Sequence, residues 1–194
     1  MQNKNFNGFT SEAQYEAVAN IVINAIDKYT NSIAVYCNTL QNGQKNVEVD
    51  VETESGHSLR YHMDSNGVFY VNTEGENFPI QECKILVALN REAGRIFDTI
   101  DSIDGQENLK KFLCGDNSVL RSSETARDSA IAAKANLDNA INAKTTKIHK
   151  DIIKDTATGV FLWRDEDIIP VIEEHYGIHL KSKGNSYYYF EYAA

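Results

Sequence analysis

The feature that most restricts the fold is a run of alternating apolar and polar residues between positions 32 and 73. Turn sequences such as Asn-Gly and Ser-Gly divide this run, and glycine and asparagine accept positive φ at small cost, which suits tight hairpins. The four alternating segments are 32–40, 46–54, 57–63 and 68–73. The pattern therefore predicts a four-stranded antiparallel meander.

Helical periodicity flanks this meander on both sides. A first helix is expected from Thr10 or Ser11, which can cap it, to between residues 28 and 31, because its apolar residues recur at steps of three and four. The chain after the meander predicts a helix over 80–103, a short helix over 106–114 and a long helix over about 122–156. The apolar stripe of the long helix is rich in alanine, which lets a neighbouring helix approach closely.

The last 35 residues or so predict a compact β-α-β unit, with strands at 160–163 and 186–192 and a helix at 167–176 that Gly177 ends. The fold class is therefore α+β. We expect two parts, 1–79 and 80–194, with Pro79 at the seam, and these parts can also pack as one domain.

Composition excludes several classes of protein. The chain has 194 residues, 42% apolar and 24% charged, which is typical of a globular protein with its own core and excludes a disordered chain or a coiled-coil rod. Its net charge of −9 disfavours direct nucleic-acid binding, because such binding needs a surplus of cations. No apolar run approaches the roughly 20 residues of a membrane span, so we expect a cytoplasmic protein.

Cys37, Cys83 and Cys114 are far apart and odd in number, which predicts free thiols rather than disulfides.

An acidic row on the second predicted strand is the most distinctive sequence feature. In NVEVDVETE the valines share one face, and Glu48, Asp50, Glu52 and Glu54 share the other. Carboxylates at this pitch could imitate successive phosphates and bind a basic groove. The alternative is an ordinary solvated sheet face, in which Arg60 and His62 of the next strand neutralise part of the row. A divalent-metal site is disfavoured because such a row does not converge on one point.

Lysines repeat at helical spacing in the long predicted helix. Lys144, Lys147, Lys150 and Lys154 would lie on one third of its circumference and could contact phosphates or an acidic partner. The alternative is that these lysines only stabilise the carboxyl end of the helix.

Tyrosines dominate the last predicted strand. Alternation places Tyr188, Phe190 and Tyr192 on one face and Tyr187, Tyr189 and Glu191 on the other. If the first face is buried, Tyr187 and Tyr189 form an exposed edge suited to a protein interface. Base stacking and burial on both sides are the alternatives.

Recognisable catalytic motifs are absent from the sequence, which contains no GxSxG, HExxH, GxGxxG or phosphate-binding loop. His175 and His179 have the spacing of zinc ligands on a helix, but Gly177 between them breaks the shared face. We therefore expect no catalytic residues, no metal and no cofactor.

The favoured function is that of a non-enzymatic interaction or inhibitor protein, acting through the acidic row, the tyrosine strand or both. A small enzyme of unfamiliar type and a nucleic-acid-binding module using the lysine stripe are the alternatives. The chain has 19 Asn, and its 13 Lys exceed its 6 Arg, as is common in AT-rich phage and mobile-element genomes. Its profile resembles that of anti-CRISPR-like or anti-restriction-like inhibitors of host nucleic-acid-targeting complexes. A homodimer through the 126–152 stripe or the 187–189 segment is also expected.

Overall fold

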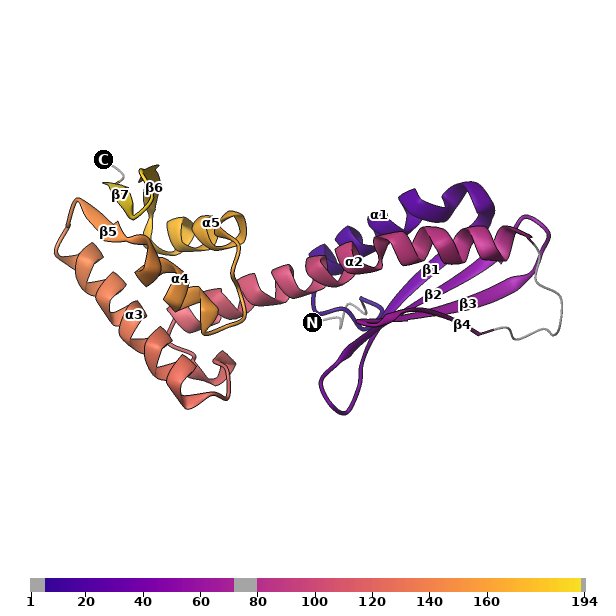
Figure 1. Cartoon of the computed structure of the whole chain (residues 1–194), viewed down its shortest axis with the longest axis horizontal. Coiled ribbons are helices and arrows are strands. Elements are labelled where there is room, and N and C mark those ends of the chain that lie inside the picture. The colour runs from indigo at the N-terminus through magenta and orange to yellow at the C-terminus, as the bar shows by residue number, and fades with distance from the viewer. Residues whose placement is uncertain (1–5, 72–79, 193–194) are drawn as a thin grey trace, which may run out of the picture. The chain divides into compact units, whose positions relative to one another are not determined.

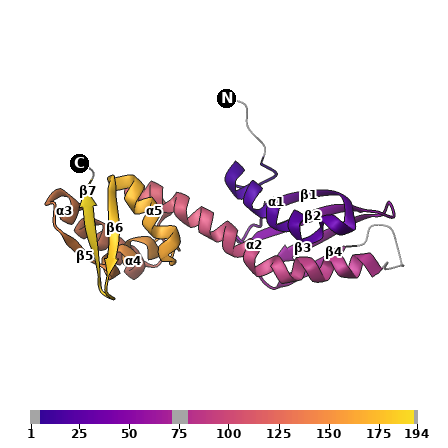
Figure 2. The same cartoon turned by 90° about the horizontal axis from the view of Figure 1, so that it is seen from above.

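The computed structural model describes residues 6–71 and 80–192 and confirms the α+β class (Figures 1 and 2). Within these residues the chain has five α-helices, a four-stranded antiparallel sheet and a three-stranded antiparallel sheet. The chain divides into two compact units, Met1–Ile100 and Asp101–Ala194. Their boundary lies inside a helix, whereas Pro79, at which the sequence analysis divided the chain, lies outside the described residues.

The first unit contains the predicted meander, in the strand order β1-β2-β3-β4 with every pair antiparallel. Its elements are α1 (Glu12–Ile26), a 3-10 helix (Asp27–Tyr29), β1 (Thr30–Thr39), β2 (Lys45–Thr53), β3 (Ser58–Asp64), β4 (Gly67–Val71) and the first part of α2 (Ile80–Leu113). Residues 72 and 73 of the fourth predicted strand lie outside the described residues. Figures 1 and 2 show α1 and this part of α2 side by side over the sheet.

The first helix begins as its sequence predicts. Ser11 caps α1, because its hydroxyl accepts a hydrogen bond from the backbone N–H of Gln14. The side chain of Gln14 is fully buried, and its amide donates to the backbone carbonyl of Ile100 in α2 over 3.1 Å. Its Oε1 accepts from the backbone and hydroxyl of Thr10. A satisfied polar group thus joins α1 to α2 inside an apolar core.

The second unit contains a smaller sheet with the strand order β5-β7-β6, so β7 is the central strand. Its elements after α2 are a 3-10 helix (Asn117–Val119), α3 (Glu124–Asn142), β5 (Lys147–His149), α4 (Lys150–Thr158), α5 (Asp165–Tyr176), β6 (Ile178–Lys183) and β7 (Tyr187–Tyr192). Of the described helices, none is both long enough and apolar enough to cross a membrane.

The two helices predicted at 80–103 and 106–114 form one continuous helix, α2, which corrects the sequence analysis. Gly105 lies inside this helix. A Cβ atom at Gly105 would lie 2.9 Å from Cδ1 of Leu162, so the glycine allows Leu162 to pack closely against the helix backbone.

The prediction of one long helix at 122–156 is also wrong, because the chain forms α3, β5 and α4 there. Lys144, in the turn after α3, adopts a φ of 49°, which ends the helical path. Ile148 continues the apolar spacing of a helix, but it is buried on β5 and pairs with Tyr188 of β7. The same spacing of apolar residues is therefore satisfied by a helix followed by a short strand.

The predicted β-α-β unit is corrected at its first strand. Residues 160–163 form a turn and an irregular segment, in which Phe161 has a φ of 63°. Val160 and Leu162 are buried and Phe161 is exposed, so the alternation resembles that of a strand. The strand β6 (178–183) was not predicted, whereas the end of α5 before Gly177, which has a φ of 63°, is confirmed.

Close approach of α3 and α4 confirms the interpretation of the alanine-rich stripe. Ala130 and Ala133 of α3 are buried, and a Cβ atom at Gly159, directly after α4, would overlap with Cβ of Ala130. The same atom would lie 3.1 Å from Cδ2 of Leu120. Two small residues therefore decide how near the two segments lie.

We expect Gly159→Ala to lower the free energy of unfolding by about 1–3 kcal/mol, because the added methyl group overpacks this contact. Gly94→Ala is the control, since Gly94 is an exposed helix residue with open space at its Cβ position. That control is expected to raise stability by about 0.5–1 kcal/mol. Urea unfolding followed by circular dichroism measures both. Equal stability of the two variants would contradict the close packing at Gly159.

Candidate functional site

The acidic row of β2 lies on the sheet face opposite the buried valines, as predicted. Arg60 of β3 donates two hydrogen bonds to the Asp50 carboxylate, over 2.7 and 2.8 Å, and its Nε lies 3.2 Å from Glu48. His62 Nδ1 lies 3.7 Å from the other oxygen of Glu48. The side chains of Glu48 and Asp50 are only 15% and 31% exposed.

Two of the four carboxylates are therefore paired within the sheet, and the single charge of Arg60 balances one of their two negative charges. The hydrogen bond to Asp50, with the charges of Asp50 and Glu48, raises the pKa of Arg60 and keeps this side chain cationic. A contact surface would require free carboxylates, whereas Glu48 and Asp50 are paired with Arg60, as in the alternative of an ordinary sheet face. Glu52 is exposed near the end of β2, and Glu54 is exposed in the turn that follows the strand.

The tyrosine strand, β7, has the predicted inner and outer faces but does not lie at an edge. Tyr188 and Phe190 are buried, Tyr189 is half-buried and Tyr187 is 37% exposed. Strand β7 pairs with β5 on one side and with β6 on the other, so the description of an exposed edge is wrong. Tyr192, which was assigned to the buried face, is 36% exposed, and its hydroxyl donates to the backbone carbonyl of Thr145.

Lysines from three strands surround the outward tyrosines. The pairing register places Tyr189 between Lys147 of β5 and Lys181 of β6, and it places Tyr187 opposite Lys183. Nζ of Lys147 lies 4.5 Å from the ring centroid of Tyr187, and Nζ of Lys183 lies 5.4 Å from that of Tyr189. We call this surface the tyrosine–lysine face; it consists of Lys147, Lys181, Lys183, Tyr187 and Tyr189.

The tyrosine–lysine face has an excess of positive charge. Glu191 is the outward carboxylate on β7, and Lys181 donates a hydrogen bond to it over 2.6 Å. That hydrogen bond lowers the pKa of Glu191, so this pair stays ionised. His149 also contributes to this side of the sheet, because its ring packs edge-on against Tyr187 with the centroids 5.2 Å apart.

The predicted lysine stripe is not formed, because its members lie on different elements. Lys144 is in the turn after α3, Lys147 is on β5, and Lys150 and Lys154 are on α4. Nζ of Lys150 donates to Ser182 Oγ over 2.7 Å and to the Gly184 carbonyl over 3.2 Å, which attaches the start of α4 to the β6–β7 hairpin. Of the four lysines, Lys147 alone belongs to the tyrosine–lysine face.

Two other tyrosines, Tyr188 and Tyr176, join elements of the second unit through hydrogen bonds to carboxylates. The hydroxyl of Tyr188 donates to Asp165 at the start of α5 over 2.8 Å, and burial together with this hydrogen bond raises the pKa of Tyr188 to about 12. The hydroxyl of Tyr176 donates to Asp138 of α3 over 2.6 Å, and its pKa is raised by the same causes. Burial would raise the pKa of Asp138, but hydrogen bonds from Lys134 and Tyr176 lower it further than burial raises it.

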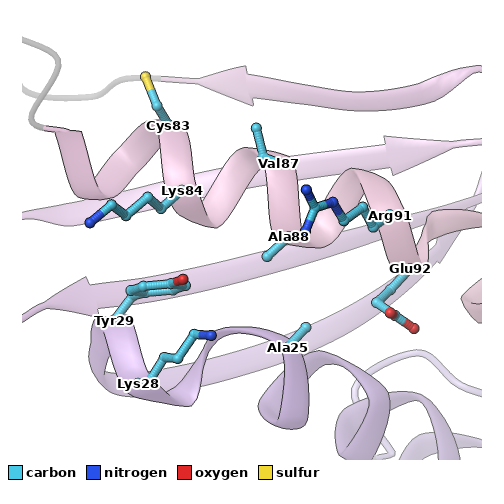
Figure 3. A pocket seen from close by; sticks show the side chains of 9 residues that line it. All are labelled: Ala25, Lys28, Tyr29, Cys83, Lys84, Val87, Ala88, Arg91 and Glu92. Atoms are coloured by element: carbon cyan, nitrogen blue, oxygen red, sulfur yellow. The ribbon is translucent and has the colours of Figure 1, made fainter.

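A groove in the first unit was missed by the sequence analysis (Figure 3). It lies between the end of α1 and the first part of α2, and its volume is about 500 Å³. Its lining comprises Ala25, Lys28, Tyr29, Cys83, Lys84, Val87, Ala88, Arg91 and Glu92. The signal in the sequence was the spacing of Lys84, Ala88 and Arg91, which places these residues on one side of a helix.

Exposed aromatic residues form a second feature that the sequence analysis missed. Phe161 and Trp163, between α4 and α5, are 51% and 57% exposed, with their ring centroids 6.0 Å apart. The guanidinium of Arg121 lies 4.4 Å from the Phe161 ring centroid. The sequence analysis placed these residues on a strand and did not single them out as an exposed pair.

Comparisons with known proteins were made for the whole chain. The chain matches no protein-family model, no curated protein and no solved structure. Among residues 6–71 and 80–192, no group of three or more His, Cys, Asp or Glu side chains is placed to hold a metal ion.

Tyr188→Phe is expected to destabilise the second unit by about 1–2 kcal/mol at neutral pH, because it removes a hydrogen bond to a carboxylate. The raised pKa predicts how this difference changes with pH. The contribution of the hydroxyl is fully present below its unfolded pKa of 10.0 and is lost as the pH rises through about 12. The stability difference between wild type and variant should therefore shrink over this range.

Urea unfolding of wild type and variant at a series of pH values measures this effect. Tyr187→Phe is the control, because the structure shows no hydrogen bond from the Tyr187 hydroxyl to a described residue. A Tyr188→Phe variant as stable as this control at neutral pH would contradict the role of the Tyr188–Asp165 hydrogen bond.

Proposed function

We propose that this chain is a non-enzymatic binding protein that attaches to an acidic surface of a partner protein through its tyrosine–lysine face. The observation that supports this most directly is the placement of Tyr187 and Tyr189 among three lysines on the outward side of a sheet. Tyrosine offers a large contact area with few rotatable bonds, and lysines at the rim favour encounter with an acidic partner.

The order of elements in the second unit also suggests a nucleic-acid role, but the charges oppose it. Helices α4 and α5, which pack together, follow the order of a helix-turn-helix motif, with a six-residue connection in place of the usual three or four. In such motifs the second helix enters the major groove of DNA. The exposed Asp165, Glu166 and Glu174 of α5 would repel phosphates there.

Base stacking on the tyrosines is disfavoured for a different reason. Lys147 and Lys183 already lie over the rings of Tyr187 and Tyr189, and His149 packs against Tyr187. A base could stack only after displacing these contacts. An acidic protein surface can pair with the same lysines while the tyrosine rings keep their positions, which favours a protein partner over a single-stranded nucleic acid.

The sequence profile supports a narrower form of the proposal. In this form the chain is a phage or mobile-element inhibitor that acts in the cytoplasm of the host cell on a nucleic-acid-targeting complex, such as a defence nuclease. The small size, the acidic charge and the preference for Asn and Lys are its basis. Glu52 and Glu54, which form no ion pair with a described residue, would be a secondary contact with a basic part of that complex.

The test uses one variant, called the face variant, that combines Lys147→Glu, Lys183→Glu, Tyr187→Ser and Tyr189→Ser. The control variant is Lys144→Glu/Lys154→Glu, which changes the charge equally outside the tyrosine–lysine face. Wild-type chain is crosslinked to host proteins, the partner is purified, and its affinity is measured for each variant. We expect the face variant to lose at least about tenfold in affinity and the control to lose little.

Three outcomes would contradict the proposal. The first is a partner that binds the face variant as tightly as it binds wild type. The second is wild-type binding to single-stranded oligonucleotides that the face variant loses. The third is a dimer in light scattering that the tyrosine substitutions dissociate, since the tyrosine–lysine face would then serve a second copy of the chain.

A further inference from the structure

We infer that the groove between α1 and α2 in the first unit binds a small organic phosphate with an aromatic or apolar body. Three cations and a set of small or aromatic side chains line the same open space. Its volume of about 500 Å³ lies within the range of sites that hold small molecules. This inference concerns a different surface from the tyrosine–lysine face and does not depend on it.

The charges of the groove are the first argument. Lys28, Lys84 and Arg91 line it, and none of them forms an ion pair with a described carboxylate. The other arginines of the first unit are already paired: Arg60 with Asp50, and Arg95 with Glu92 at 3.6 Å. The unpaired cations of the described part of this unit thus gather around one cavity.

This concentration of cations stands out against the charge of its surroundings. Residues 1–100 contain 13 acidic and 7 basic residues, so the unit as a whole is anionic. Glu92 is the acidic residue in the lining, and its ion pair with Arg95 satisfies it. A ligand carrying two negative charges would find three cations and one paired carboxylate, and an arginine can bind a phosphate through two parallel hydrogen bonds.

The apolar part of the lining is the second argument. Ala25 of α1 and Ala88 of α2 face each other across the gap, and their short side chains leave the space open (Figure 3). The ring of Tyr29 lies at one end, and Figure 3 shows the Lys84 side chain above it on α2. Val87 is 49% exposed on the same helix. A flat or apolar body would cover this surface while its phosphate reaches the cations.

The fold explains why these residues meet. The 3-10 helix after α1 ends the helical path and places Lys28 and Tyr29 at the mouth of the groove, with Nζ of Lys28 4.9 Å from the Tyr29 ring centroid. On α2, the steps from Lys84 to Ala88 and from Ala88 to Arg91 are four and three residues, so these side chains project from one side of the helix.

The test compares three probes by titration calorimetry: phenyl phosphate, inorganic phosphate and the neutral benzyl alcohol. We expect phenyl phosphate to bind at least about fivefold more tightly than inorganic phosphate, because the ring adds apolar contact. Benzyl alcohol should not bind measurably, and the affinity of phenyl phosphate should fall as salt rises. An equal affinity for phenyl phosphate and inorganic phosphate would overturn the inference and leave nonspecific anion binding.

Two kinds of variant locate the site. Lys84→Ser/Arg91→Ser should weaken phenyl phosphate binding at least about tenfold, because charge-assisted hydrogen bonds are lost. Lys144→Ser/Lys154→Ser, with the same loss of charge in the second unit, should bind as wild type. Ala88→Leu keeps all three cations but fills the gap, so it should also weaken binding. Wild-type affinity in the serine variant or in Ala88→Leu would overturn the assignment of the ligand to this groove.

Cys83 provides an independent readout at the same place. Its exposed thiol lines the groove, Cys37 is buried, and Cys114 can be removed as Cys114→Ser. Phenyl phosphate should slow maleimide labelling of Cys83 in that background, and benzyl alcohol should not. Labelling that is unchanged at saturating phenyl phosphate would also count against the groove. The partner affinity of the face variant tests the proposed function alone. Neither result of that measurement affects the assignment of the ligand to the groove.

Discussion

One-sided burial of two small sheets is the constraint on which the structure depends. In each sheet, alternate residues of a strand enter a core that helices complete, and the residues between them face outward. Val47, Val49 and Val51 of β2 are buried in the first unit, and Tyr188 and Phe190 of β7 are buried in the second. The outward positions of these strands are not part of the two cores, so their side chains contact one another and solvent.

The two outward faces use this freedom differently. On the four-stranded sheet, Arg60 pairs with Asp50 and Glu48 across neighbouring strands, so these two carboxylates of the acidic row already have a cationic partner. On the three-stranded sheet, three lysines and two tyrosines face outward with a single outward carboxylate, Glu191, on β7. Exposed ion pairs contribute little stability, so the difference matters mainly for binding. It is the reason why the tyrosine–lysine face is the better candidate.

Small residues decide where segments lie close together, and the sequence analysis misinterpreted one of them, Gly105, by ending a helix before it. Gly105 lies inside α2 against Leu162, and Gly159 lies against Ala130 of α3. Apolar spacing was equally ambiguous: Ile148 fits the period of a helix but lies on β5, and the alternation around Phe161 fits a strand but forms a turn. In each case the local pattern was compatible with two structures, and contacts with distant segments selected one of them.

The sequence by itself determined the meander, the cap of α1 at Ser11, the inner and outer faces of β2 and β7, and the end of α5 before Gly177. These features depend on hairpin turns, capping and alternation, which act over a few residues. Only the tertiary structure decided between a free acidic row and one paired with Arg60, placed Lys147 beside the outward tyrosines, and brought three cations together in the groove between α1 and α2. Each of these arrangements joins residues that are distant in the chain, and local propensity carries no information about such pairing.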